Sequence, residues 1–319
     1  MSDTMDICGL KAERGQKLQT YIPVLDSNTK IPITIINGQN DGPTLLITAG
    51  IHGGEYPGIA AAIEISQAIE PEVISGCLII IHPVNIRSFW ERSAFVTPDD
   101  GKNLNREFPG DVNGTLSQKT AWLLSRHFFP LADFYADLHS GDIHEELYPY
   151  VYYPGLPNSE ISAKAREVAM VLDMKFMVRS TATTGAYNYA AISGVPSLLI
   201  ERGGSGLCRR EDIDAYKNDL HNILCKLELL CSPQQQQKHT PVDVTDVIYL
   251  ETDQAGCWFS RCRGDKIKQG DKLGYLTDLF GNTITVYNAE QDGIILYQCS
   301  ALAAPKGTIL VTYGKVKNN

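Results

Sequence analysis

The sequence predicts an α/β protein with a largely parallel sheet and helices on both faces, followed by a small all-β domain. Short apolar runs at residues 45–49, 77–81 and 195–200 have the length of buried strands. Segments with helical spacing lie between them, and strands that alternate with helices indicate a parallel sheet. From residue 243 to 314 the helical spacing is lost, and short β-rich runs are broken by glycines.

The first elements are a strand, a turn, a second strand and a helix. Residues 31–36 alternate and are rich in β-branched side chains, as strands are, and residues 40–43 have the composition of a turn. The strand at 45–49 comes next, and residues 59–68 have helical spacing. Pro57 lies near the first turn of this helix, where a missing N–H costs little.

The remaining elements follow the same alternation. Residues 85–114 are loop-like, and a loop of this length in a compact domain is usually functional. Further helices are expected at 116–129, at 159–173 with Ser159 as the cap, and at 211–231, and a strand is expected at 132–138.

A composition change marks the domain boundary. Ser232 and Pro233 are followed by four glutamines, which is typical of a linker. We therefore expect an α/β domain at residues 1–232, a linker at 233–242 and a β-rich domain at 243–319.

Composition and charge exclude several classes of protein. The chain has 319 residues, 43% of them hydrophobic and 20% charged, which is ordinary for a globular protein. A net charge of −9 argues against a nucleic-acid binder, which needs clustered basic residues. The N-terminus lacks the apolar core of a signal peptide, and no run of eighteen apolar residues predicts a membrane span. We expect a cytoplasmic protein without nucleic-acid or membrane partners.

The eight cysteines are scattered without CxxC spacing, and we expect reduced, mostly structural thiols. Cys257 and Cys262 are close enough to suggest a disulfide or a zinc site. No second pair follows them, which argues against both.

Ionisable side chains follow three of the expected strands. His52 and Glu55 come after the strand at 45–49, His139 after the strand at 132–138, and Glu201 after the strand at 195–200. Ligand sites of α/β sheets lie at the carboxyl ends of the strands. Two histidines and a carboxylate, with water as the fourth ligand, are a common catalytic zinc set. The alternative is a glycine-rich turn in which His52 and Glu55 only form local hydrogen bonds.

Glu201 supplies the proton acceptor that such a site still needs. A carboxylate beside the metal can accept the proton of the attacking water and pass it to the leaving amine. A salt bridge is the structural alternative. Arg202 is the weaker partner for it, because adjacent residues of a strand face opposite ways.

The long loop contains groups that bind anions. Asn105 and Arg106 are assigned to a substrate carboxylate, because arginine grips carboxylates with two parallel hydrogen bonds and asparagine adds a neutral donor. Arg92 is assigned to the oxyanion that forms as the carbonyl becomes tetrahedral. Arg87 competes for this role, and a solvated surface loop is the alternative for all four residues.

Four motifs occur in order: His-Gly-Gly-Glu from His52, Asn-Leu-Asn-Arg-Glu-Phe-Pro-Gly from Asn103, Asp-Leu-His-Ser-Gly from Asp137 and Glu-Arg-Gly-Gly from Glu201. Together they resemble the succinylglutamate desuccinylase and aspartoacylase family of the zinc carboxypeptidase fold group. The resemblance extends from about residue 42 to residue 204. It implies a zinc-carboxypeptidase-like fold and removal of an N-acyl group from a small amino acid.

The resemblance also implies a role for each matching residue. His52, Glu55 and His139 would bind one Zn²⁺ per chain, Glu201 would be the general base, and Asn105 with Arg106 would bind the carboxylate. Arg92 matches the family arginine less securely, because Ser93 and Ala94 separate it from Phe95.

Other polar residues near these motifs are weaker candidates. Asp137, two residues before His139, faces the same side of its strand and could orient that imidazole or be an ordinary strand-end carboxylate. Tyr187 and Tyr189 are expected to pack rather than react. We expect a structural role for His82 and none for His144.

The C-terminal segment resembles a biotinyl- or lipoyl-carrier barrel, with residues 263–274 and 288–293 as its halves. A carrier needs a lysine at the hairpin tip between them. Residues 278–282 contain no lysine, so we expect a shielding or oligomer-forming domain instead of a carrier.

The predicted function is zinc-dependent hydrolysis of the amide bond in a small, carboxylate-bearing N-acyl amino acid, with metal-bound water attacking the carbonyl. A metallocarboxypeptidase acting on short peptides is the nearest alternative, and an ester substrate is chemically possible. A non-catalytic binding protein with a metallopeptidase-like domain is the alternative from another class, and it predicts an incomplete site.

Overall fold

The structure is a computed structural model that describes residues 4–155, 158–260 and 266–317. Its strands are β1 Thr4–Ile7, β2 Leu10–Glu13, β3 Gln16–Pro23, β4 Lys30–Asn37, β5 Asn40–Ala49, β6 Ser75–Ile81, β7 Val96–Thr97, β8 Lys102–Asn103, β9 Phe134–His139, β10 Glu145–Leu147, β11 Tyr150–Pro154, β12 Phe176–Ser180, β13 Ser197–Glu201, β14 Val242–Glu251, β15 Gly256–Ser260, β16 Lys266–Ile267, β17 Lys272–Thr277, β18 Thr283–Asn288, β19 Gly293–Cys299, β20 Ala303–Ala304 and β21 Ile309–Val316.

The α-helices are α1 Tyr56–Ala68, α2 Ile86–Glu91, α3 Leu116–Leu123, α4 Ser159–Ala169, α5 Ala186–Ile192 and α6 Arg210–Lys226. Short 3-10 turns occur at Pro71–Val73, Leu104–Arg106 and Phe129–Leu131, and a π-helical turn at Leu124–Phe128.

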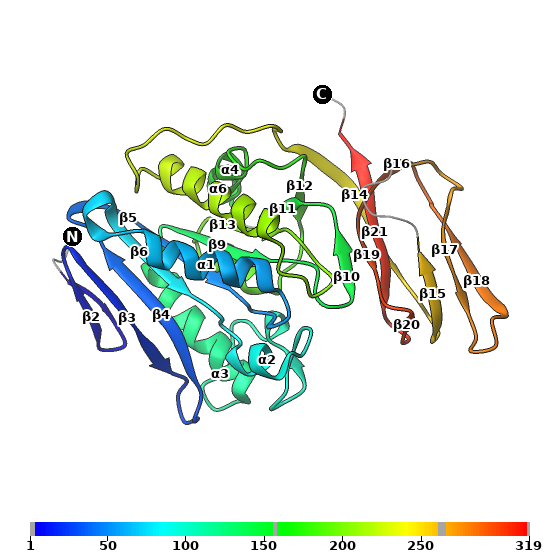
Figure 1. The fold of residues 1–319 in the computed structure, drawn as a ribbon, viewed down its shortest axis with the longest axis horizontal. Coiled ribbons are helices and arrows are strands. Elements are labelled where there is room, and N and C mark those ends of the chain that lie inside the picture. Colours follow the sequence, from blue (N-terminus) through cyan, green and yellow to red (C-terminus); the bar gives the residue numbers. More distant parts are fainter. Residues whose placement is uncertain (1–3, 156–157, 261–265, 318–319) are drawn as a thin grey trace.

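A 13-stranded mixed sheet runs through the molecule in the order β10-β19-β21-β14-β12-β11-β13-β9-β5-β6-β4-β3, with β16 beside β19 (Figure 1). Its middle strands β6, β5, β9 and β13 are parallel neighbours. Antiparallel pairs lie toward both ends of the sheet. Parallel pairing brings the carboxyl ends of β5, β9 and β13 to one edge, where His52, His139 and Glu201 follow or end these strands.

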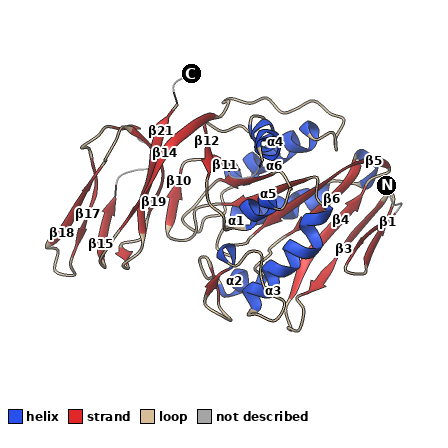
Figure 2. Cartoon of the chain, turned by 180° about the vertical axis from the view of Figure 1, so that it is seen from behind, coloured by secondary structure: helices blue, strands red, loops and turns tan. Residues whose placement is uncertain are grey.

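Helices cover both faces of this sheet, so its middle strands are buried on both sides (Figure 2). Helices α1, α4 and α6 pack on one face in a core that includes Leu45, Ile47 and Leu138. Helices α3 and α5 pack on the other face, where the core includes Leu46 and Tyr135. The predicted α/β class with helices on both faces is confirmed.

Several local expectations are corrected. The segment 85–114 is not a continuous loop, because it contains α2, the β7–β8 pair and a 3-10 turn. The cap of α4 is Asn158, whose side chain accepts a hydrogen bond from the Ile161 backbone, and Ser159 is the first helical residue. The segment expected as a helix at 116–129 is helical throughout, but α3 ends at Leu123 and the chain continues as the π-helical turn Leu124–Phe128 and a 3-10 turn.

The C-terminal strands continue the large sheet. Strand β14 pairs in parallel with β12 and antiparallel with β21, and β19 and β10 follow outward. A second, four-stranded sheet in the order β18-β17-β15-β20 packs beside them over a separate core around Trp258 and Leu276. The proposed domain boundaries stay a prediction. Cys262, Arg263, Gly264 and Asp265, which entered two of the sequence arguments, lie outside the described residues.

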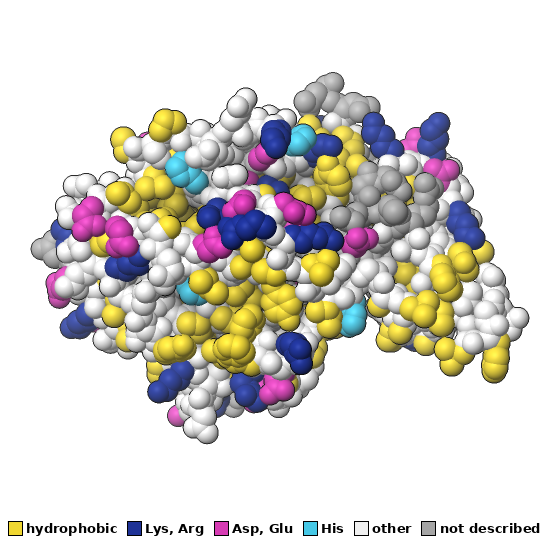
Figure 3. Space-filling view, viewed as in Figure 1, with side chains coloured by type: hydrophobic (Ala, Val, Ile, Leu, Met, Phe, Trp, Pro, Cys, Tyr) yellow, Lys and Arg dark blue, Asp and Glu magenta, His cyan; other side chains and the backbone are white. Residues whose placement is uncertain are grey.

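The β17–β18 hairpin ends in a turn organised by Asp278, whose carboxylate accepts hydrogen bonds from the backbone N–H groups of Phe280 and Asn282. Leu279 and Phe280 are 89% and 91% exposed at its tip. Hydrophobic side chains are visible at this end of the molecule (Figure 3). Among the described residues, no helix has the length and apolarity needed to cross a bilayer.

Candidate functional site

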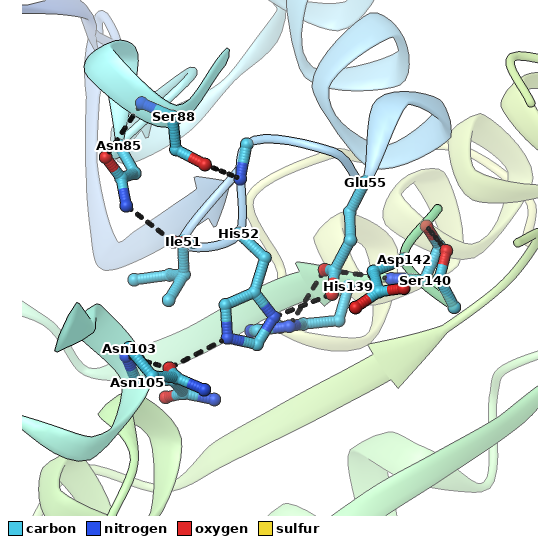
Figure 4. Close-up of polar contacts among 12 residues, drawn as sticks. Ile51, His52, Glu55, Asn85, Ser88, Asn103, Asn105, His139, Ser140 and Asp142 are labelled. Carbon is cyan, nitrogen blue, oxygen red and sulfur yellow. Dashed lines mark hydrogen bonds and ion pairs between the residues drawn. The ribbon is translucent and has the colours of Figure 1, made fainter. Parts of the chain in front are cut away.

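The loop between β5 and α1 carries His52 and Glu55. Gly53 lies so close to α2 that an added Cβ would come within 2.2 Å of the Phe89 backbone nitrogen. Its N–H donates to the Ser88 hydroxyl, which attaches the loop to α2 (Figure 4). Glu55 is the N-cap residue of α1, and Pro57 lies in the first turn of this helix.

His52, Glu55 and His139 form a compact cluster, with possible ligand atoms within 4.8 Å of one another. The Glu55 carboxylate lies between the two imidazoles, 2.7 Å from His52 Nδ1 and 2.9 Å from His139 Nδ1 (Figure 4). The Ser140 backbone N–H also donates to Glu55, at 3.1 Å. The fold therefore brings together three side chains from two neighbouring strand ends.

The electrostatics of the cluster favour a charged carboxylate. Burial alone would raise the pKa of Glu55, but His139 and His52 lower it to about 2. Burial likewise opposes a charge on His139, yet Asp137 and Glu55 raise the pKa of this imidazole well above its usual value. A metal that binds to these nitrogens must therefore compete with protons.

Each of the two imidazoles forms a hydrogen bond through Nε2, on the side of the ring away from Glu55. His139 Nε2 lies 3.0 Å from Asp137 Oδ2, and His52 Nε2 lies 3.1 Å from Asn103 Oδ1. Ionised carboxylates only accept hydrogen bonds, so His139 donates from Nε2. In both residues Nδ1 faces Glu55. Asn103 was missed by the sequence analysis, although it begins the Asn-Leu-Asn-Arg motif.

Glu201 ends β13 directly opposite His139 of β9 in the sheet register. Its Oε2 atom is buried and has no hydrogen-bond partner among the described residues. Burial and repulsion from Glu55 raise the pKa of Glu201 well above its usual value. The salt bridge considered between Glu201 and Arg202 does not form, because Arg202 Nε donates to Asp219 at 2.6 Å. Glu201 is thus an unpaired carboxyl group beside the cluster.

A cavity of about 1230 Å³ opens over this cluster. His52, Glu55, His139, Glu201, Asn105 and Arg106 all line it. The side-chain Oδ1 of Asn105 accepts a hydrogen bond from the Ala186 backbone at 2.8 Å, which fixes this residue to the start of α5.

The other predicted arginines lie elsewhere. Arg92 is the exposed C-cap of α2, with φ of 53°, and is not among the residues that line the cavity. Arg87 is also outside it and pairs with Asp99 at 3.0 Å and with Glu91 at 3.6 Å. The oxyanion role of Arg92 stays a prediction that its position does not support. Arg106 and Arg179 are the arginines that line the cavity among the described residues.

The remaining cavity wall contains residues that the motifs did not identify. Asp142 and Glu145 follow β9, and Tyr249, Tyr297 and Lys306 come from the C-terminal strands and loops. Their contribution depends on tertiary pairing of distant segments, for which the sequence carries no local signal. Of the minor candidates, Tyr187 and His144 line the cavity, whereas Tyr189 and His82 do not.

Comparison with known proteins assigns the chain to a family. A model of the succinylglutamate desuccinylase/aspartoacylase catalytic domain matches residues 41–227, more than half of the 319-residue chain. The chain belongs to this family. Membership in the succinylglutamate desuccinylase/aspartoacylase family makes it a hydrolase of the deacylase type.

Individual members of the family are similar over most of the chain. An N-α-acetyl-L-2,4-diaminobutyric acid deacetylase from Halomonas elongata is 28% identical over 280 residues, covering 83% of this chain and 80% of the relative. A crystal structure of a succinylglutamate desuccinylase from Silicibacter sp. is 26% identical, with a TM-score of 0.80, and covers 94% of this chain and 93% of the other.

A product-bound structure of the ectoine utilization protein EutE (DoeB) from Ruegeria pomeroyi has a TM-score of 0.83 and 25% identity. It covers 93% of this chain and 94% of the other chain. These structures confirm the mixed α/β fold, and their likeness to this chain extends over both the catalytic part and the C-terminal strands.

Proposed function

We propose that this protein is a zinc-dependent deacylase that hydrolyses the amide bond of a small N-acyl amino acid. The observation that carries the proposal is the position of Glu201 beside the His52–Glu55–His139 cluster in one cavity, with its buried Oε2 atom left without a hydrogen-bond partner among the described residues. Membership in a deacylase family supports the same reaction class.

The cluster has the donor set of a catalytic zinc site. Two imidazole Nδ1 atoms face the Glu55 carboxylate, and the possible ligand atoms of the three residues lie within 4.8 Å of one another. A tetrahedral zinc ion held by these three residues would keep one position for water or substrate. When bound, one Zn²⁺ per chain would polarise the substrate carbonyl and lower the pKa of a bound water toward about 7. Zinc is thus the cofactor that we propose.

Glu201 is the proposed general base. It would accept the proton of the attacking water and then deliver it to the leaving amine. A raised pKa supports the second half of this role, because the carboxyl group then holds the proton until the amine departs. Asn105 and Arg106 would hold the substrate carboxylate, Arg106 through paired hydrogen bonds.

The cavity also favours a positively charged substrate group. Asp142 is 4% exposed and Glu145 lies three residues later, and neither forms an ion pair within the described part of the chain. Burial and repulsion from Asp142 raise the pKa of Glu145 to about 8. Carboxyl groups that lack an ion-pair partner in a cavity are costly to charge, and a substrate ammonium group would compensate Asp142 and Glu145. The diaminobutyric acid named for the Halomonas relative is a compound of this type.

The first test measures zinc in the purified protein by mass spectrometry, for the wild type and for His52→Ala prepared in parallel. We expect about one zinc per chain in the wild type and a large loss in the variant. Wild-type protein that binds no stoichiometric zinc even after zinc is supplied would refute the proposal.

The second test compares N-acyl amino acids with short peptides as substrates. We expect deacylation of the first group, with Glu201→Gln retaining zinc and losing roughly 10²- to 10⁴-fold in kcat. Faster release of C-terminal residues from peptides would favour the metallocarboxypeptidase. A zinc-loaded protein without activity on either group would favour the non-catalytic binding protein.

A further inference from the structure

A chain of four polar side chains runs beneath the metal cluster, inside the sheet. Tyr135, Thr48 and Asp137 are each 0% exposed, and His139 is 2% exposed. The parallel middle of a sheet is otherwise lined with apolar residues, and buried polar groups are costly unless each has a partner. The partners of these four side chains therefore indicate what the chain contributes to the structure.

The sheet register builds this chain. Tyr135, Asp137 and His139 alternate along β9, so their side chains point to the same face. Thr48 of β5 is the direct register partner of Asp137. The Thr48 hydroxyl lies 2.6 Å from the Tyr135 hydroxyl and 2.7 Å from Asp137 Oδ1, and the other oxygen, Oδ2, lies 3.0 Å from His139 Nε2.

The hydrogen bond from Thr48 to Asp137 Oδ1 sets the order of the hydroxyl protons in this chain. The Asp137 carboxylate only accepts, so Thr48 must donate its single hydroxyl proton to Oδ1. Thr48 can then only accept from Tyr135, whose phenol therefore donates. At the other end, Asp137 Oδ2 accepts from His139 Nε2–H. Because Nε2 donates to Asp137, Nδ1 is the His139 nitrogen that would bind a metal, and it faces Glu55.

We infer that Thr48 and Tyr135 are positioning residues for the metal ligand His139, acting through Asp137. The Thr48 hydroxyl holds the Asp137 carboxylate in the plane that His139 needs, and Tyr135 holds the Thr48 hydroxyl in its donating orientation. This inference rests on the proposed zinc site, and it adds residues that lie outside all four sequence motifs and outside the cavity lining.

Thr44 provides a matched control. It lies on β5, four residues before Thr48 and on the same face of the strand, and it is 6% exposed. Its hydroxyl takes no part in the chain. Thr44→Val and Thr48→Val therefore make the same chemical change in the same strand, and only the second removes a hydrogen bond to Asp137.

The experiment measures the zinc dissociation constant by chelator competition for the wild type, Thr48→Val, Thr48→Ser, Tyr135→Phe and Thr44→Val. We expect roughly tenfold weaker binding or more in Thr48→Val, as for other partners of metal-binding histidines. Thr48→Ser retains the hydroxyl and should bind like the wild type, as should Thr44→Val. Tyr135→Phe should show a smaller loss, and it tests the chain even if Thr48→Val does not fold.

A second readout separates positioning from stability. Side-chain ¹⁵N shifts of zinc-loaded protein report which nitrogen of His139 carries the proton, and we expect Nε2–H in the wild type with an altered Nε2 shift in Thr48→Val. Unchanged zinc affinity and unchanged shifts in folded Thr48→Val and Tyr135→Phe would overturn the inference alone. Wild-type protein that binds no zinc would overturn the proposed function as well.

Discussion

Asp142 and Glu145 are the residues that we expect to distinguish one substrate from another. The proposed carboxylate and metal contacts would be the same for all N-acyl amino acids. Asp142→Asn and Glu145→Gln are expected to raise KM for an N-acetyl diamino acid by roughly tenfold or more, since each removes a charge-assisted contact. The KM for N-acetyl-2-aminobutyrate, which lacks the second amine, should stay nearly constant. Steady-state kinetics with both substrates test this.

Asp246 is the control for these substitutions. It also lines the cavity, but its carboxylate already pairs with Lys315 at 3.2 Å. Asp246→Asn should therefore affect the two substrates equally. If Asp142→Asn and Glu145→Gln also change KM equally for both substrates, these residues do not bind the positively charged group of the substrate.

His82 makes the folded protein sensitive to acid. Both ring nitrogens are buried without a hydrogen-bond partner among the described residues, and burial lowers the pKa of His82 from 6.5 to about 4. Between these values the unfolded chain binds the proton and the folded chain does not, so stability falls as the pH falls. The loss from pH 7 to pH 5 amounts to about 2 kcal/mol.

Replacement of His82 by leucine removes this contribution of His82 to the pH dependence of stability. His82→Leu should therefore lose about 2 kcal/mol less than the wild type in its free energy of unfolding between pH 7 and pH 5. Denaturant unfolding at both pH values, on metal-free protein, measures the difference. Parallel pH profiles for the two proteins would mean that His82 is protonated in the folded state.

The proximity of side chains could be predicted from the sequence where they follow or end strands of the parallel sheet. His52, Glu55, His139 and Glu201 could be grouped in advance, because carboxyl ends of parallel strands meet at one edge. Asn103 and Asp142 could not, since their positions depend on how loops fold back over that edge. Arg92 was assigned from its type and its loop, and neither determines which way the side chain points.

At the scale of elements, the tight contact between α2 and the loop that carries His52 and Glu55 predicts the effect of one methyl group. Gly53→Ala would place Cβ 2.2 Å from the Phe89 nitrogen, so the loop must move. Because His52 is the preceding residue, we expect weaker zinc binding together with a lower Tm. Chelator competition and thermal unfolding measure the two effects. Unchanged zinc affinity would show that α2 does not set the position of His52.

Apolar runs and helical spacing predicted the middle strands and the long helices, because burial of both sheet faces leaves a direct pattern in the sequence. Helix α2 was missed because six residues are too short to show a period. The α4 cap was placed one residue late, since Asn158 and Ser159 are both good caps and only geometry distinguishes them. Strand order and register, which bring Thr48 beside Asp137, are set by tertiary pairing.

At the scale of the whole molecule, the change in composition after residue 232 indicated a separate β domain. These domain boundaries stay a prediction, and within the described residues one hydrogen-bonded sheet continues from β12 into β14, β21 and β19. The composition of a segment does not determine which strands it pairs with. The pairing in this 13-stranded sheet depends on which strand edges are free once the rest of the chain has folded. The C-terminal segment also supplies Tyr249, Tyr297 and Lys306 to the cavity.

Different parts of the chain supply the ionisable cluster and the rest of the cavity lining. The histidines and Glu201 lie before the glutamine-rich segment, whereas part of the cavity lining, including Tyr249 and Lys306, lies after it. Substitutions in β14 or in the loops around Lys306 can therefore reshape what the protein accepts while the reacting groups stay untouched. In the proposed deacylase, a chain that lost its last strands would therefore keep His52, Glu55, His139 and Glu201 but lack the part of the cavity lining that β14 and the loop around Lys306 supply.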